Sequence, residues 1–255
     1  ELTTSEPYAM GSHATCSGAW CSCPEDISPP EYFWGYNRMT TIEGLFGAGD
    51  AVGGTPHAFS SGSFTEGRLA AKAACKYIDD GKGEGIVVSD AQIERRKKEI
   101  FKPLEHYKVY RNAVVAGTVN PHYINPQQGL DRLQKLMDEY CGGVTVNYMT
   151  NEKLLSIGLK KLRIMEEDLE QLAAEDIHEL LRAWELKHRH RAAECVTQHT
   201  LFRKETRWPG YYYRGDAMKV DDENWHVLTV SRRDPNTGEY TMEKAPCYHL
   251  VGDEA

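Results

Sequence analysis

The stretch from Gly44 to Arg68, GLFGAGDAVGGTPHAFSSGSFTEGR, limits more than any other what this chain can fold into. Its apolar lead-in, Leu45-Phe46, predicts the end of a buried strand, and a helix is expected to begin near Ser63. Between the two lie glycines, small polar residues and one acid, Asp50. A strand, a glycine-rich turn, an acid and a helix start in this order are typical of a cradle for a nucleotide cofactor.

Each group of the predicted cradle has a chemical reason to be there. Glycine at Gly47, Gly49 and Gly54 lets the backbone approach a ligand where a side chain would collide. The carboxylate of Asp50 can accept hydrogen bonds from sugar-type hydroxyls. The helix start offers unpaired N–H groups and a partial positive charge, which suit a phosphate or an electron-rich ring edge. For this motif taken alone, an ordinary glycine-rich loop between a strand and a helix is the alternative.

Composition excludes several other classes of function. With 255 residues the chain can form one large or two modest domains, and its net charge of −8 argues against a nucleic-acid groove or an anionic membrane surface. No apolar run approaches about 18 residues, so we predict no membrane-spanning helix. Seven cysteines, an odd number, favour reduced thiols in the cytoplasm over a disulfide framework. Cys16, Cys21 and Cys23 have no matching CxxC pair downstream, so no metal site is predicted.

The segment before the cradle combines prolines, aromatic residues and one histidine. Pro24, Pro29 and Pro30 predict an extended loop rather than a helix over much of residues 1–40. His13 stands between Ser12 and Ala14. A histidine in such a setting is more often structural, but its closeness to the cradle leaves a catalytic role open.

The amino-acid composition changes after the cradle, and this change predicts where the domains divide. Residues 1–85 are expected to form one domain, ending in a helix over 64–80 and a glycine-rich linker. Residues 86–200 are long and charged, and predict a helical domain. Helix starts are expected at the capping residues Ser89, Asn125 and Asn151, and a further helix is expected from about Glu175 to about Thr200. The first of these helices is expected to meet Pro103 near its end.

The last predicted domain, residues 201–255, begins with an arginine- and aromatic-rich segment. Arg203, Arg207 and Arg214, with aromatic residues between them, could hold a phosphate or sulfate and stack a base. They could equally pin the helices to the cofactor domain through ion pairs, or contact a partner, and the sequence leaves these readings open. Beyond them, His226–Arg232 and Glu239–Met242 alternate as strands around a turn, which predicts a β-hairpin.

A family resemblance joins these motifs. The stretches GLFGAGDAVGGTPHAFSSGSFTEGRLAAKAA, EPYAMGSHATCSGAW and ETRWPGYYYRGD resemble those of the alpha subunits of dissimilatory adenylylsulfate reductases. These subunits belong to the wider class of succinate dehydrogenase, fumarate reductase and aspartate oxidase flavoproteins. The fold that the resemblance implies is α/β plus mainly α: the carboxy-terminal part of an FAD-binding dinucleotide fold, then a helical bundle and a terminal β-hairpin.

The resemblance also implies an activity and a set of partners. It implies FAD as the cofactor and interconversion of adenylylsulfate with AMP plus sulfite, through nucleophilic attack of reduced flavin on sulfur. Electrons would be exchanged with an iron–sulfur beta subunit, so iron–sulfur clusters are expected only on that partner. The physiological direction, sulfate reduction or sulfur oxidation, is left open.

The resemblance assigns roles to the residues already singled out. His13 is the implied catalytic residue, hydrogen-bonding or charge-stabilising at the sulfate group. Asp50 would hold ribityl hydroxyls, while Gly47, Gly49 and Gly54 allow close approach to the FAD. Ser63 and Thr65 would face the pyrimidine edge of the flavin.

Two departures from the class pattern qualify the resemblance. The GxGxxG strand–turn–helix that should hold the FAD pyrophosphate is absent, so we expect the chain to be the carboxy-terminal part of a longer subunit. Where relatives acting on dicarboxylates carry an arginine, this chain reads HAFSSG, with Ser60 at or near that position. This argues against a dicarboxylate substrate. The alternatives are another flavin oxidoreductase of the class, or an inactive piece that only docks a partner subunit.

Overall fold

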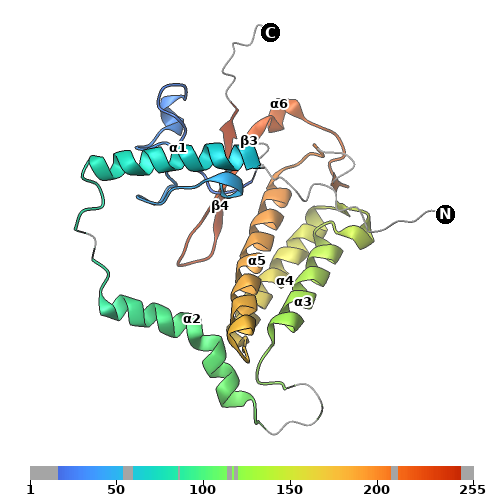
Figure 1. Ribbon diagram of the computed structural model, residues 1–255. Coiled ribbons are helices and arrows are strands. Elements are labelled where there is room, and N and C mark those ends of the chain that lie inside the picture. The colour runs from blue at the N-terminus through green and yellow to red at the C-terminus, as the bar shows by residue number, and fades with distance from the viewer. Residues whose placement is uncertain are drawn as a thin grey trace, which may run out of the picture. The chain divides into compact units, whose positions relative to one another are not determined.

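The computed structural model describes residues 17–53, 60–85, 87–113, 117, 120–207 and 212–247 (Figure 1). Contacts within the chain divide it into two compact units. The first comprises residues 1–87 and 247–255, and the second comprises residues 88–246. The first unit contains the predicted cradle, and the second contains the helices together with the terminal hairpin.

The first unit is organised on one long helix, α1 (Ser60–Asp79). Its buried face repeats every three or four residues, through Glu66, Ala70, Ala73 and Tyr77. This confirms the predicted helix, although it begins at Ser60, three residues before the expected start near Ser63. The short helices η1 (Pro30–Tyr32) and η2 (Gly49–Ala51) lie in the loops of the same unit.

The described part of the first unit pairs its backbone only at isolated bridges. These join Ala19 to Val52 in parallel, and Cys21 to Thr40 and Met39 to Phe46 antiparallel. The prediction that Leu45-Phe46 ends a buried strand is therefore wrong, because Leu45 is 50% exposed. The physical reason is the turn before it: the Leu45 N–H donates to the Ile42 carbonyl (3.1 Å), and the chain reverses there.

The second unit is built on four helices that begin where the capping residues predict. They are α2 (Asp90–Tyr110), α3 (Pro126–Tyr140), α4 (Glu152–Asp168) and α5 (Ile177–Phe202). Two of them open with a complete capping box, formed by Ser89 with Gln92 and by Asn125 with Gln128. The side chain of Asn151 caps α4, and that of Asp176 caps α5.

The core of the second unit lies between α3, α4 and α5, which Figure 1 shows packed beside one another. Leu133 and Leu136 of α3 meet Leu162 and Met165 of α4 and Leu186 of α5 there. Leu130, Met137 and Tyr140 of α3 are partly buried and pack against this core. The predicted helical bundle is confirmed in these three helices.

The position of Pro103 in α2 differs from the prediction. The helix does not end near this proline but continues for seven more residues to Tyr110, with Pro103 buried inside it. A proline inside a helix removes one hydrogen bond and crowds the preceding turn. Two hydrogen bonds hold α2 in place here. The Ala174 N–H donates to the Pro103 carbonyl (3.0 Å), and the Trp184 indole donates to the Ile100 carbonyl (3.0 Å).

Two small sheets complete the second unit. The parallel pair β1 (Met149–Thr150) and β2 (Tyr213–Arg214) joins the loop before α4 to the segment after α5. The antiparallel pair β3 (Val227–Arg233) and β4 (Tyr240–Pro246) is the predicted hairpin, entered through the short helix α6 (Asp222–Trp225). The remaining short helices are η3 (Val144–Val146) and η4 (Leu169–Gln171). Every helix in the described residues is too short or too polar to cross a bilayer.

Candidate functional site

The glycine turn of the predicted cradle, Gly47–Ala51, packs against the first turns of α1. Gly49 has φ +63°, and a Cβ placed there would lie 3.2 Å from the Ser63 hydroxyl. Gly47 is buried, and a Cβ there would lie 2.9 Å from the Cys21 sulfur. Gly49 therefore needs glycine because of its left-handed backbone and its neighbour Ser63, and Gly47 because the Cys21 sulfur leaves no room for a side chain.

The turn is held from both sides by backbone hydrogen bonds. On one side Ala19 donates to the Ala51 carbonyl (2.7 Å) and accepts from the Gly53 N–H (2.9 Å). On the other side the Gly47 N–H donates to the Arg38 carbonyl (2.9 Å). The geometry of the turn is thus set before any ligand binds, which is what a preorganised binding loop requires.

The chemistry available at the turn is that of one carboxylate and one helix start. Asp50, the residue after Gly49, is exposed. The close approach of Gly49 to Ser63 brings the turn to the beginning of α1. The first four N–H groups of a helix have no acceptor within it, and the 20-residue α1 carries a full helix dipole. A hydroxyl-accepting carboxylate beside such a helix start fits the ribityl and ring-edge side of a flavin.

The structure brings four of the predicted cofactor residues together: Gly47, Gly49, Asp50 and Ser63. Thr65 is exposed, and its hydroxyl donates to the Ser61 carbonyl (2.9 Å), so this group is already used within the helix. The other two predicted residues, the catalytic His13 and the cofactor-binding Gly54, lie outside the described residues.

An ion pair behind the turn was not predicted from the sequence. Arg38 donates to Glu66 of α1 from Nε and from Nη2, the latter at 2.9 Å, and the two side chains are 15% and 7% exposed. The only sequence signal is the register of Glu66, which shares the buried face of α1 with Ala70 and Ala73. A carboxylate on an apolar face indicates a buried partner, but the sequence does not say which basic residue supplies it.

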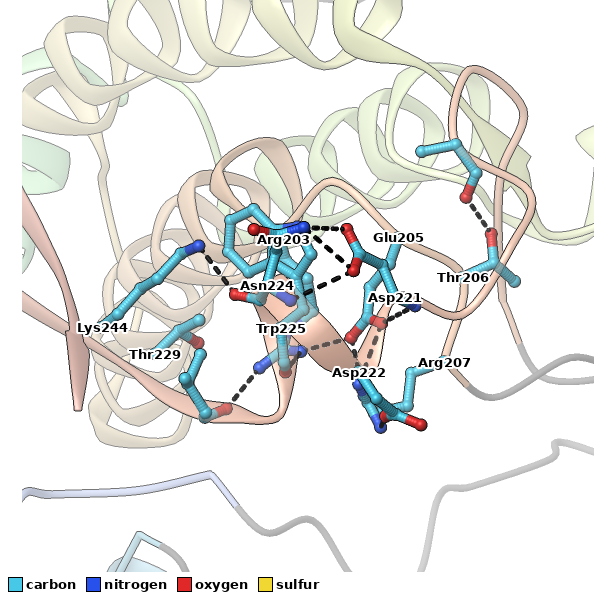
Figure 2. Close-up of polar contacts among 12 residues, drawn as sticks. Arg203, Glu205, Thr206, Arg207, Asp221, Asp222, Asn224, Trp225, Thr229 and Lys244 are labelled. Carbon is cyan, nitrogen blue, oxygen red and sulfur yellow. Dashed lines mark hydrogen bonds and ion pairs between the residues drawn. The ribbon is translucent and has the colours of Figure 1, made fainter. Parts of the chain in front are cut away.

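In the second unit, Arg203 and Arg207 of the aromatic-rich segment point at internal acceptors (Figure 2). Arg203 donates to the Glu205 carboxylate and to the carbonyls of Trp225 (2.8 Å) and Val227 (2.7 Å). Arg207 donates to Glu205 (2.6 and 2.9 Å) and to Asp222 (2.9 Å). The two arginines thereby tie the end of α5 to the segment that leads into β3.

Glu205 is the acceptor at the centre of this cluster. Its side chain has no exposed surface, and it also accepts from the Asp221 N–H (3.0 Å). Burial alone would raise the pKa of the Glu205 carboxyl, but the hydrogen bonds from Arg207, Asp221 and Arg203 outweigh burial and lower it below its ordinary value. The carboxylate is therefore charged and fully partnered at neutral pH.

Arg214 is the most deeply buried of the three arginines, with its side chain 1% exposed. It donates to both oxygens of Asp216 (2.9 Å each) and to the carbonyls of Thr200 (2.5 Å) and Arg203 (2.7 Å). These bonds use its guanidinium within the protein. The acceptors named for the three arginines all lie in the second unit, which favours a structural role over an anion site, but a role within this unit rather than the expected ion pairs to the cofactor domain.

The described cysteines are free thiols. Cys21 is buried and Cys75 is exposed, while Cys23, Cys141, Cys195 and Cys247 are partly buried. Burial raises the pKa of the Cys21 thiol more than the Arg38 charge lowers it, so this thiol stays protonated. In the part of the chain that the structure describes, no three His, Cys, Asp or Glu side chains gather as a metal site would require.

Comparison with known proteins finds the chain similar to a flavoprotein family and to adenylylsulfate reductases. Residues 130–250 match the family described as fumarate reductase flavoprotein C-term. The whole chain is 40% identical, over 263 aligned residues, to the adenylylsulfate reductase subunit alpha of Megalodesulfovibrio gigas, of which it spans 39%.

Two solved structures are similar in sequence and in fold. The adenylylsulfate reductase of the hyperthermophile Archaeoglobus fulgidus is 50% identical, with a TM-score of 0.87 over 92% of this chain and 37% of that one. An adenosine-5-phosphosulfate reductase in complex with sulfite, as a covalent adduct, matches with the same identity and coverage and a TM-score of 0.86. The chain thus spans well under half the length of these relatives.

Proposed function

Because the chain belongs to the family of adenylylsulfate reductase alpha subunits, we propose that the whole protein interconverts adenylylsulfate with AMP plus sulfite. The observation that carries the proposal is the packing of the Asp50 turn against the start of α1, where a Cβ added to Gly49 would lie only 3.2 Å from the Ser63 hydroxyl. That arrangement supplies a hydroxyl acceptor and a helix dipole on one side of a cofactor site.

The cofactor that fits this arrangement is FAD, which membership of a flavoprotein family implies. In the proposed site, Asp50 accepts hydrogen bonds from the ribityl hydroxyls, and Gly49 and Gly54 give close approach. Ser63 and the first N–H groups of α1 face the pyrimidine edge, where the helix dipole favours negative charge. When bound and reduced, the flavin supplies the nucleophile and the two electrons that the sulfur accepts. Thr65 is assigned to the same side of the cofactor site as Ser63, although its hydroxyl donates to the Ser61 carbonyl within α1.

The protein groups then have to orient the substrate and stabilise its charge. His13 is the proposed catalytic residue, donating a hydrogen bond or carrying positive charge at the sulfate oxygens. Ser60, at or near the position of the arginine that dicarboxylate enzymes use, leaves a dicarboxylate without a bidentate partner. Arg203, Arg207 and Arg214 are committed to internal acceptors and have a structural role in this proposal.

The proposal includes a partner and a location. An iron–sulfur beta subunit supplies or removes the electrons in this proposal, as the family resemblance implies. The free thiols of the described residues favour the reducing environment of the cytoplasm. In the finer fold assignment, the first unit is the carboxy-terminal part of an FAD-binding dinucleotide fold.

The test is an assay of the whole protein, purified with its partner subunit. We expect it to form adenylylsulfate from AMP and sulfite in the presence of an artificial electron acceptor, and to leave succinate unoxidised. Oxidation of succinate without any reaction of AMP and sulfite would favour the other enzymes of the class. Absence of both activities in flavin-loaded protein would favour a chain that only docks a partner.

A substitution at His13 tests the assigned catalytic group. We expect His13→Ala to lower turnover of adenylylsulfate by about 100-fold, a usual size for the loss of an acid–base or charge-stabilising group, with FAD content unchanged. His178→Ala, at an exposed histidine of α5 in the second unit, is the control and should keep the parental rate. If His13→Ala turns over at the parental rate, the histidine has only a structural role.

A further inference from the structure

The Arg38–Glu66 pair lies directly behind the glycine turn. Its two side chains form a two-point contact, Nε to one carboxylate oxygen and Nη2 to the other at 2.9 Å. The side chains are 15% and 7% exposed, so the pair is largely removed from water. A buried pair of this geometry is costly to break from one side, because the remaining charge loses its partner.

Both members of the pair are connected to the turn through short paths. The Arg38 carbonyl accepts the Gly47 N–H (2.9 Å), so the residue that binds Glu66 also holds the first glycine of the turn. Glu66 stands three residues after Ser63, which contacts Gly49. Two successive turns of α1 are therefore each attached to one glycine of the cradle, and the pair fixes where α1 lies along it.

The backbone of Arg38 supports a role beyond packing. Its φ is +65°, in the left-handed region that a non-glycine residue adopts at an energetic cost. The Arg38 N–H donates to the Ser22 carbonyl (2.8 Å), and this bond together with the Gly47 bond and the Glu66 contact holds the conformation. A strained residue held by three attachments is typical of a site where geometry has been fixed for function.

We propose that Arg38 and Glu66 are positioning residues for the cofactor: their ion pair sets the register of α1 against the Gly47–Ala51 turn. This proposal rests on the proposed function, because it deepens the assignment of that turn to FAD. The pair does not touch the cofactor in this account. It acts through the Gly47 N–H and through the contact of Ser63 with Gly49, which place Asp50 at the helix start.

The experiment measures FAD rebinding by the whole protein after removal of its flavin. Glu66→Gln keeps the shape of the side chain but removes its charge, and Glu66→Asp keeps the charge at a shorter reach. Arg38→Lys keeps the charge but loses the two-point contact. Lys72→Gln, an exposed charge on the same helix, is the matched control. The readouts are the dissociation constant for FAD, the visible spectrum of the bound flavin, and the melting temperature of the flavin-free protein.

The expected result is a Kd raised by at least about tenfold in Glu66→Gln and in Arg38→Lys, with the control within about twofold of the parent. The double variant should bind FAD about as weakly as the weaker single variant, because one interaction has been removed in each case. Glu66→Asp should lie between the parent and Glu66→Gln.

A purely structural role gives a different pattern. The melting temperature of the flavin-free protein would fall in Glu66→Gln, while its Kd for FAD and the flavin spectrum stayed parental, and this would overturn the proposal. If Glu66→Gln does not fold, the same comparison made with Glu66→Asp decides. If the parent protein binds FAD but does not act on adenylylsulfate, only the proposed function is contradicted. The comparison of the dissociation constants for FAD between parent and variants still tests the role of Arg38 and Glu66.

Discussion

At the scale of single residues, one buried carboxylate decides how the arginine-rich segment is used. Arg203 and Arg207 both donate to Glu205, whose side chain has no exposed surface. The sequence presents the arginines and aromatic residues, a composition that fits an anion site and a structural ion-pair cluster equally well. The acceptors that separate these readings, Glu205 and several backbone carbonyls, come together only in the folded chain. A glutamate is usually exposed, so its burial could not be predicted from its identity.

Removal of Glu205 should therefore be far more costly than removal of its neighbour. We expect Glu205→Ala to destabilise the second unit by about 3–5 kcal/mol, because Arg203 loses its carboxylate partner and Arg207 keeps only the exposed Asp222. The matched control is Lys204→Ala, whose exposed pair with Glu152 (3.5 Å) should be worth less than about 1 kcal/mol. Chemical denaturation of the whole protein measures both. Equal midpoints for the two variants would show that the buried cluster is not what holds this segment.

The Arg214–Asp216 pair predicts how stability depends on acid. The hydrogen bonds from Arg214 lower the pKa of Asp216 to about 2. An unfolded aspartate titrates near 3.9, so the folded state holds its carboxylate charged to lower pH than the unfolded state does. The pair thus stabilises the fold fully above about pH 4, and this contribution is lost as the pH falls toward 2.

The measurement is the melting temperature between about pH 5 and pH 2 for the parent and for Asp216→Asn. The variant should be less stable at neutral pH, and its melting temperature should fall less steeply through this window, because it no longer has the carboxylate that titrates. Parallel curves for the two proteins would contradict the assignment of the acid-sensitive step to Asp216.

At the scale of elements, local signals predicted the helices and the β3–β4 hairpin but not the short parallel pair of β1 and β2. Capping residues and apolar periodicity are local, and the helices after Ser89, Asn125 and Asn151 begin where these signals occur. The parallel contact between β1 and β2 joins residues about sixty positions apart, and two-residue strands leave no pattern to read. The turn that exposes Leu45 was missed because an apolar pair followed by glycine has the composition of a strand end.

Two glycines inside helices, Gly129 and Gly67, should respond in opposite ways to replacement by alanine: one variant should lose stability and the other gain it. A Cβ at Gly129 of α3 would lie 2.5 Å from a methyl group of Leu186, which is 2% exposed in the core, whereas a Cβ at Gly67 of α1 would meet nothing within 4 Å. We expect Gly129→Ala to lower stability by about 1–3 kcal/mol through overpacking between α3 and α5. Gly67→Ala should raise the stability of α1 by up to about 1 kcal/mol, from helix propensity. Thermal unfolding measures both, and stabilisation by Gly129→Ala would show that Leu186 has room to move.

At the scale of the whole molecule, the chain combines a preorganised turn-and-helix site with a separately packed helical unit. The sequence predicted the chemistry of the first unit from glycine, acid and helix start, and the structure brings Gly49, Asp50 and the start of α1 together. It did not predict Arg38–Glu66, because a long-range ion pair has no spacing rule. The roles of His13 and Gly54, which lie outside the described residues, remain predictions from the family resemblance.

The central claim is that the Gly44–Arg68 stretch holds FAD, and the most direct test is the FAD content of the whole protein after extensive dialysis. Asp50→Ala should raise the dissociation constant for FAD by about 5- to 150-fold, since unpaired hydroxyl partners cost about 1–3 kcal/mol. Asp79→Ala, an exposed aspartate at the far end of α1, should keep parental FAD content. Full retention of FAD by Asp50→Ala under the same dialysis would contradict the cradle.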